Sequence, residues 1–243
     1  TAGDTTFLGK VGDSIALTSL TTDATGAGAG TTWIKGGVVT TTGNQTYNDA
    51  VQLDVADVTL TSTGTGANAG NITFAKTLDG AQNLTITAAG DTTFLDKVGN
   101  TIALSSLTTD STGAGLGTTW IKGGVITTTG AQTYNDAVRL ATNDVVLTST
   151  ASGLNASSGT ITFATTLDGA QNLTLTAAGD TTFLGKVGDL IALTSLTTDS
   201  ASAGAGTTFI KGGVVTTTGA QTYNDAVRLA TNDVVLTSTA SGL

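Results

Sequence analysis

Residues 40–51 read TTTGNQTYNDAV, and the phrase returns with one substitution, as TTTGAQTYNDAV, at residues 127–138 and 216–227. The copies start 87 and then 89 residues apart, and much of the sequence between them also recurs. A long period built from shorter apolar pulses is typical of a stacked solenoid. We therefore expect residues 1–243 to form a single continuous solenoid fragment, with repeats at approximately 1–87, 88–176 and 177–243, the last incomplete.

Each long repeat divides into several shorter units of similar length. Short stretches such as residues 60–63 (LTST) alternate apolar and polar side chains, and glycine-bearing bends usually follow. Alternation predicts strands with one face turned inward. Three short strands and their bends fit one coil of about 20 residues. The predicted fold is an all-β parallel β-helix, or β-solenoid, with about four coils per repeat of 87–89 residues.

The same units carry a Thr–aromatic element, and in three of them an aliphatic residue follows four positions later. These pairs are Tyr47 with Val51, Phe74 with Leu78, and Phe94 with Val98. In a solenoid, equivalent side chains of successive coils lie above one another, about 4.7–4.9 Å apart. We expect Val51, Leu78 and Val98 to form an internal ladder, with the aromatic residues, Trp33 included, adding further layers.

The composition narrows the class of protein. Charged residues make up only 11 % of the chain and hydrophobic residues 39 %, which is enough to bury a core. Cys and His are absent, so thiolate metal sites, disulfides and a histidine base are excluded. No apolar run approaches the roughly 20 residues of a membrane-spanning helix. The net charge of −9 disfavours nucleic acid as a partner.

One family shares this pattern of repeats. The run GGVVTTTGNQTYNDAV (residues 36–51), LTST (60–63) and ITFAKTLDGAQNLTITAAGDTTF (72–94) resembles the repeats of giant bacterial surface adhesins of the filamentous haemagglutinin-like group. The resemblance covers essentially the whole chain. It implies a right-handed parallel β-helix that is exported to the cell surface, often through an outer-membrane partner.

Catalytic and metal sites find little support in the residues. Paired carboxylates serve glycoside hydrolases, and Asp49, Asp57 and Asp79 are the obvious candidates. Aspartate also caps bends, and Asp49 and Asp79 stand in bend-like contexts. Asp57, Asp79 and Asp91 lack the spacing of calcium-binding repeats. We therefore expect no enzyme activity, no metal and no cofactor.

Each of three lysines, Lys35, Lys122 and Lys211, precedes a Gly-Gly pair. We expect these lysines at corners, where they can pair with nearby aspartates. Such exposed ion pairs contribute at most about 1 kcal/mol to stability.

Threonine provides the main alternative to a purely structural role. The T-x-T units Thr40/Thr42, Thr61/Thr63 and Thr85/Thr87 can share one strand position in successive coils. If they point outward, they form a flat and weakly polar face, similar to the threonine arrays of ice-binding β-solenoids. The simpler interpretation is that β-branched threonine suits an exposed strand.

The sequence thus favours a structural and adhesive segment of a long extracellular or cell-surface protein or fibre. It would act as a stiff stalk and as a lateral interaction surface. Expected partners are other copies of the chain, through end-to-end or lateral stacking, and other cell surfaces. The alternatives are an ice-binding β-solenoid and, third, a polysaccharide-acting β-helix enzyme.

Overall fold

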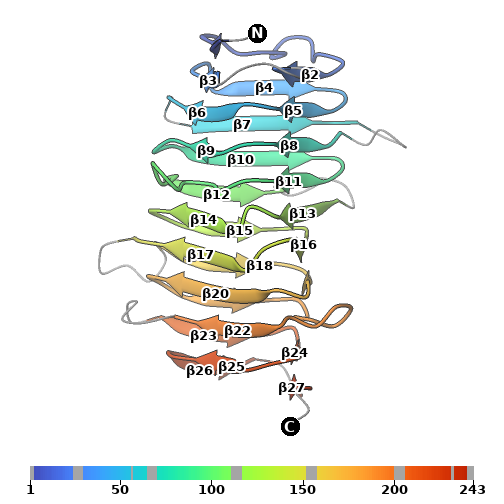
Figure 1. The fold of residues 1–243 in the computed structure, drawn as a ribbon, viewed down its shortest axis with the longest axis vertical. Helices are drawn as coiled ribbons and strands as arrows, with labels where there is room; N and C mark the ends of the chain where they lie inside the picture. The colour runs from blue at the N-terminus through green and yellow to red at the C-terminus, as the bar shows by residue number, and fades with distance from the viewer. Residues whose placement is uncertain are drawn as a thin grey trace.

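The computed structural model describes residues 3–23, 30–55, 57–64, 70–110, 117–151, 158–199, 206–230 and 233–239. Over these ranges the regular elements are strands, and all of their pairings are parallel. No helix in this part of the chain is long and apolar enough to cross a membrane. Figure 1 shows the coils stacked from the N-terminus to the C-terminus. The predicted all-β parallel solenoid is therefore confirmed.

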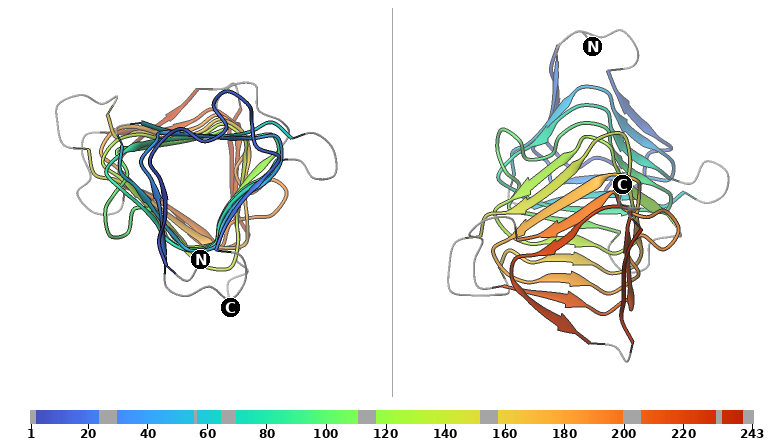
Figure 2. Two further views of the ribbon diagram at one scale, coloured as in Figure 1. Left: turned by 90° about the horizontal axis from the view of Figure 1, so that it is seen from above. Right: turned by 60° about the horizontal axis from the view of Figure 1, so that its bottom comes forward.

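The strands form three faces around a triangular cross-section (Figure 2, left). Face 1 begins with β1 (Thr5–Phe7), β3 (Thr31–Ile34), β6 (Ala50–Leu53) and β9 (Leu78–Asp79). It continues through single bridges at Val98 and Leu104 into β14 (Val125–Thr128), β17 (Val145–Ser149), β20 (Asn172–Ala177), β22 (Ser195–Thr198) and β25 (Gln221–Tyr223).

Face 2 is one nine-stranded sheet. Its strands are β4 (Val38–Thr41), β7 (Asp57–Ser62), β10 (Asn83–Ala88), β12 (Ser106–Thr109), β15 (Gln132–Tyr134), β18 (Ile161–Phe163), β21 (Thr181–Phe183), β23 (Thr207–Ile210) and β26 (Ala226–Leu229).

Face 3 begins with a seven-stranded sheet and continues, through bridges at Val187 and Leu193, into a two-stranded sheet. Its strands are β2 (Leu20–Thr22), β5 (Gln45–Tyr47), β8 (Ile72–Phe74), β11 (Thr92–Phe94), β13 (Thr118–Ile121), β16 (Ala137–Leu140), β19 (Leu167–Asp168), β24 (Val214–Thr217) and β27 (Val235–Ser238).

Aliphatic side chains of successive coils stack inside the tube. Val51 pairs in register with Leu78, and Leu78 with Val98, so the predicted internal ladder is confirmed. All three side chains are buried, and in β6 the neighbours of Val51 alternate outward. This alternation is what the pleat of a strand imposes when one face closes a core.

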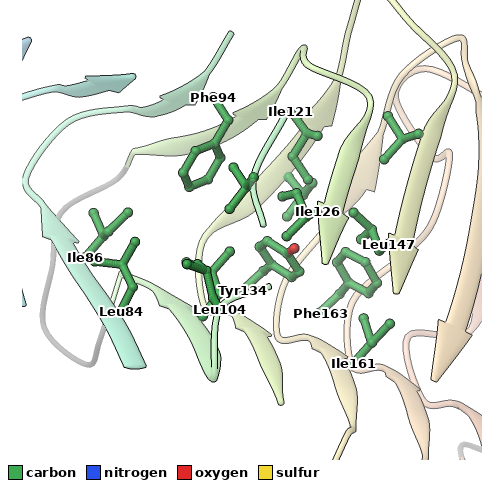
Figure 3. Close-up of a cluster of buried hydrophobic side chains, with 14 of the residues drawn as sticks. Leu84, Ile86, Phe94, Leu104, Ile121, Ile126, Tyr134, Leu147, Ile161 and Phe163 are labelled. Carbon is green, nitrogen blue, oxygen red and sulfur yellow. The ribbon is translucent and has the colours of Figure 1, made fainter. Parts of the chain in front are cut away.

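Aromatic rings form a second kind of ladder. Tyr47, Phe74 and Phe94 stack with ring centroids 5.1 and 5.5 Å apart. Tyr134, Phe163 and Phe183 repeat the arrangement, and Figure 3 shows Tyr134 and Phe163 among the buried aliphatic side chains.

Trp33 does not join these internal layers, so that part of the aromatic prediction is wrong. In β3 the buried residues are Thr32 and Ile34, and Trp33 therefore points outward. In the strand that follows, Val39 is fully buried and Val38 is half-buried.

Many coils are longer than predicted. Hydrogen bonds between adjacent coils join Asn71 to Asp91 and Asp91 to Thr118, which lie 20 and 27 positions apart in the sequence. Another such bond joins Asp144 to Asn172, 28 positions apart. Short and long coils alternate along face 1. Four successive coils therefore contain more residues than one repeat of 87–89 residues. The prediction of about four coils per repeat is not confirmed.

Because a repeat is shorter than four coils, each repeat is rotated about the solenoid axis relative to the one before it. The equivalent strands β3, β13 and β23 lie on face 1, face 3 and face 2. Along the described residues β13 is the eleventh strand position after β3, with the interrupted position at 98–104 counted as one. Eleven positions on three faces make three and two-thirds coils, one position short of four. Successive repeats are thus rotated by one face about the axis.

The interrupted position depends on a glycine. Val98 and Leu104 both bridge to β14, and the residues between them bulge outward from the coil. Gly99 opens this bulge with a φ of 63°, and a Cβ atom there would collide with the backbone carbonyl of Thr127. Gly12 and Gly188 repeat the arrangement in the other two repeats. The position therefore requires glycine.

Candidate functional site: the outward threonine rows

A row of threonines runs down face 2 and points away from the core. Adjacent coils pair these residues in register, and each is half-buried between buried neighbours along its strand. We call this set the long threonine row: Thr59, Thr85, Thr108, Thr133, Thr162 and Thr182. It presents one hydroxyl and one methyl group per coil on six consecutive coils.

The predicted T-x-T residues fall into more than one row. Thr40, Thr61 and Thr87 pair with each other and form a second, shorter row on face 2. Thr85 belongs to the long threonine row instead, because it pairs with Thr59. The T-x-T units are therefore offset by two residues between β7 and β10.

Thr42 and Thr63 lie just beyond the ends of β4 and β7, where both are exposed. The backbone N–H of Thr42 donates to the carbonyl of Leu17 at 2.7 Å, and that of Thr63 to the carbonyl of Thr41 at 3.1 Å. The backbone groups of these two threonines continue the hydrogen bonding between coils into the corner. Neither threonine is part of the long threonine row.

Outward rows end at an aromatic ring followed by an arginine. On face 2 the long threonine row continues from Thr182 to Phe209 and Arg228. On face 3 the row Thr46, Thr73 and Thr93 leads to Trp120 and Arg139. Sequence reasoning missed both endings, because it assigned Trp33 and its equivalents to the core.

Lysines gather at the same rings. Lys122 Nζ lies 5.0 Å from the Trp120 ring centroid, with the Arg139 guanidinium at 5.9 Å. Lys211 Nζ lies 5.1 Å from the centroid of Phe209. We call Trp120, Lys122 and Arg139, and likewise Phe209, Lys211 and Arg228, the aromatic–cation clusters.

The first repeat differs at this position. Lys35 Nζ lies 4.9 Å from the Trp33 ring centroid and also forms an ion pair with Asp54 at 3.0 Å. The predicted pairing of corner lysines with aspartate therefore holds for Lys35. Among the described residues no ion pair is formed by Lys122 or Lys211.

The candidate catalytic carboxylates each have separate local partners. Asp49 is buried and accepts hydrogen bonds from the hydroxyls of Thr22 and Thr32 at 2.9 and 2.7 Å. Asp57 is exposed and accepts from the Asn83 amide at 2.8 Å.

Asp79 and Asp91 cap backbone groups of the following coil. Asp79 accepts from the backbone N–H groups of Thr101 and Ile102, at 2.8 and 3.1 Å. Asp91 accepts from Thr118 N–H at 3.0 Å and from Trp120 Nε1–H at 3.1 Å. No three acidic side chains within the described ranges form a group that could hold a metal ion.

Pairs of neighbouring aspartates, all buried except the half-buried Asp225, recur in the second and third repeats and were not foreseen. The carboxyl groups of Asp110 and Asp136 lie beside each other, and those of Asp199 and Asp225 repeat the pair. Burial and then this neighbour raise the pKa of Asp110 to about 8, and the same causes raise the pKa of Asp199 to about 7. Two adjacent carboxyl groups in such a place retain one shared proton near neutral pH.

The chain was compared with protein-family models, with curated proteins and with solved structures, and none of the three comparisons gives a match.

Proposed function

We propose that the chain is a structural and adhesive segment of a long bacterial extracellular or cell-surface protein or fibre. It serves as a stiff stalk with a lateral interaction surface, in the manner of the filamentous haemagglutinin-like adhesins whose repeats it resembles. The observation that carries the proposal is a single buried hydrophobic cluster that extends from Ile34 to Val215 through successive coils.

A tube of this kind resists bending at every coil. Each coil hydrogen-bonds to the next through its backbone and buries several aliphatic or aromatic side chains. Each such side chain contributes about 1.5–3 kcal/mol of transfer free energy. Stability is therefore a sum of coil interfaces, as in other solenoids, and requires neither disulfide nor metal.

The stalk proposal is tested by lengthening the chain with one and two further repeats. Each added repeat of three and two-thirds coils should lengthen the particle by about 18 Å in small-angle scattering. The urea midpoint and the m-value should both rise with length, because more coil interfaces unfold together. A constant midpoint with a particle that widens instead of lengthening would refute the stalk.

Self-association, end to end or lateral, is the partner interaction that we propose for the stalk. The edge of a coil carries a row of backbone N–H and C=O groups that a further coil can pair. Sedimentation velocity should show association that rises with concentration, and a sedimentation coefficient independent of concentration would contradict it.

Cell-surface location follows from the resemblance and is tested on the source cells. An antibody against the chain should label intact cells, and protease added outside should remove the label. Labelling only after the cells are permeabilised would overturn this part of the proposal.

Ice binding is the second candidate function, and the long threonine row favours it. Six hydroxyl–methyl groups repeat at the coil spacing of about 4.7–4.9 Å on one face. The chain would then show thermal hysteresis, and Thr133→Leu would reduce it. The same substitution at Thr73 on face 3 is the matched control. Absence of hysteresis in the parent chain removes this candidate.

A further inference from the structure

We propose that the aromatic–cation clusters of the second and third repeats bind a carboxylate-bearing polysaccharide. The proposal rests on the proposed function, because it names a ligand class for the lateral surface of the stalk. It starts from a difference between repeats at two positions. Gln52 and Asp54 of the first repeat are replaced by Arg139 and Ala141 in the second, and by Arg228 and Ala230 in the third.

These replacements change the charge of the site without changing its backbone. In the first repeat Lys35 and Asp54 neutralise each other as an ion pair. In the second repeat Lys122 and Arg139 both remain, and alanine stands where the aspartate would be. Each cluster thus carries two cations. At Trp120 the Asp91 carboxylate, which accepts the indole N–H, offsets one of them, and the cluster stays net positive on a chain whose net charge is −9. A local charge opposite to that of the whole chain selects an anionic partner at that point.

The cations are held in place before any ligand arrives. Trp120 keeps Lys122 and Arg139 beside its ring, and its indole N–H is fixed by Asp91 at 3.1 Å. Such cation–ring contacts restrict two long side chains and lower the entropy lost on binding. An arginine guanidinium matches a carboxylate with two parallel hydrogen bonds, and the lysine adds a second charge.

The surroundings favour a saccharide over an acidic peptide. Threonine hydroxyls at Thr73 and Thr93 lead along the same row to Trp120, and Thr162 and Thr182 lead likewise to Phe209. A row of hydroxyls ending in a ring and two cations matches a polymer rich in hydroxyls with spaced carboxylates. At the Trp120 cluster both strands, β13 and β16, are paired on both sides, so a peptide cannot add to an open sheet edge there.

The rotation between repeats fixes the stoichiometry. The cluster at Trp120 lies on face 3 and the cluster at Phe209 on face 2. A short oligosaccharide running along one face therefore reaches one cluster only. We expect two independent sites per chain for short oligomers, and tighter binding of long polymers that bend around the corner and engage both.

The experiment is a calorimetric titration of the full chain with short polygalacturonate oligomers. The double substitution Arg139→Gln with Ala141→Asp gives the second repeat the residues that the first repeat has at these positions. Arg228→Gln with Ala230→Asp does the same in the third repeat. Each should remove one of the two sites, and all four substitutions together should weaken binding at least about tenfold. The reverse change, Gln52→Arg with Asp54→Ala, should add a third site at Trp33.

Controls separate this proposal from general electrostatics and from the stalk itself. Lys76→Asp, at an exposed lysine outside the clusters, makes the same charge change and should leave binding intact. Neutral dextran should not bind. Equal binding of poly-glutamate would overturn the preference for saccharide, and unchanged binding in the fourfold variant would overturn the site. Urea midpoints are measured in parallel. Failure of the folded parent chain to bind the oligomers would refute the ligand proposal and leave the stalk proposal standing.

Discussion

The carboxyl groups of Asp110 and Asp136 lie beside each other across two neighbouring coils, just beyond the paired strands β12 and β15. Asp110 Oδ1 accepts the backbone N–H of Ala88 at 2.8 Å, and Asp136 Oδ1 accepts the Thr119 hydroxyl at 2.8 Å. The Oδ2 atom of each carboxyl is buried and is reached by no hydrogen-bond donor. Because burial and the neighbouring Asp136 raise the pKa of Asp110 to about 8, we infer that the pair keeps one proton near neutral pH.

Stability should fall as the pH rises through the neutral range. The pKa of Asp110 is raised to about 8 and that of Asp199 to about 7, both above the ordinary value of 3.8. The folded chain then holds protons that the unfolded chain releases near pH 4, so their contribution is complete below that pH and is lost toward pH 7–8. Within this window each such group lowers the free energy of unfolding by about 1.4 kcal/mol per pH unit. Urea unfolding across the range measures the slope.

Asp110→Asn should flatten this dependence. Asparagine tolerates the φ of 49° at this position, and its amide can donate to Asp136 where the shared proton lies now. The same substitution at exposed Asp233 should leave the slope unchanged. A slope unaltered by Asp110→Asn would contradict the shared proton.

Phe163→Ala should destabilise the chain by about 3–5 kcal/mol. Phe163 stacks on Tyr134 and on Phe183, with centroids 5.1 and 5.5 Å away, so its loss opens a cavity between two coils. Thr162→Ala, on the outward face of the same strand, should change stability by less than about 0.5 kcal/mol. Equal effects of the two substitutions in urea unfolding would contradict the assignment of inward and outward faces.

Gln132→Leu should cost about 1–3 kcal/mol although it increases hydrophobicity. The buried Gln132 amide donates to the carbonyl of Thr148 at 2.9 Å, and its Oε1 accepts the Tyr134 hydroxyl at 2.9 Å. Leucine would leave that hydroxyl buried without a partner. Combining Gln132→Leu with Tyr134→Phe should recover part of the loss, which a double-mutant cycle measures. Strict additivity would show that the hydrogen bond contributes nothing.

Gly99→Ala should destabilise by roughly 1–3 kcal/mol, because the left-handed φ and the carbonyl of Thr127 both exclude a Cβ atom. Gly9→Ala, where a Cβ meets open space, is the matched control. Thermal unfolding distinguishes the two, and an unaffected Gly99→Ala chain would show that the bulge can adopt another backbone path.

Sequence reasoning predicts the features that depend on local alternation and on stacking. It places Val51, Leu78 and Val98 in one ladder because each follows an inward aromatic residue at the same distance. The prediction for Trp33 is wrong because Trp33 and Ile34 are adjacent and both apolar, so alternation alone does not say which of them faces inward. The adjacent coil decides, and it places Ile34 against the core.

The threonine rows are predicted only in part for a related reason. Thr40, Thr61 and Thr87 do form a row, but the register between β7 and β10 places Thr85 against Thr59. Register across coils depends on how many residues each corner uses. The buried acid pairs escape notice in the sequence because aspartate in a bend gives the same local signal whether it caps a backbone group or contacts a second carboxyl one coil away.

The turn of one face between repeats has a consequence for how longer arrays would vary. Inserting or deleting a whole repeat preserves every internal contact, yet it swings everything beyond the change by a third of a revolution. The number of repeats would then set the rotational orientation of the far end of the array as well as its length. Any feature carried at the far end would return to its original bearing only after three units were gained or lost.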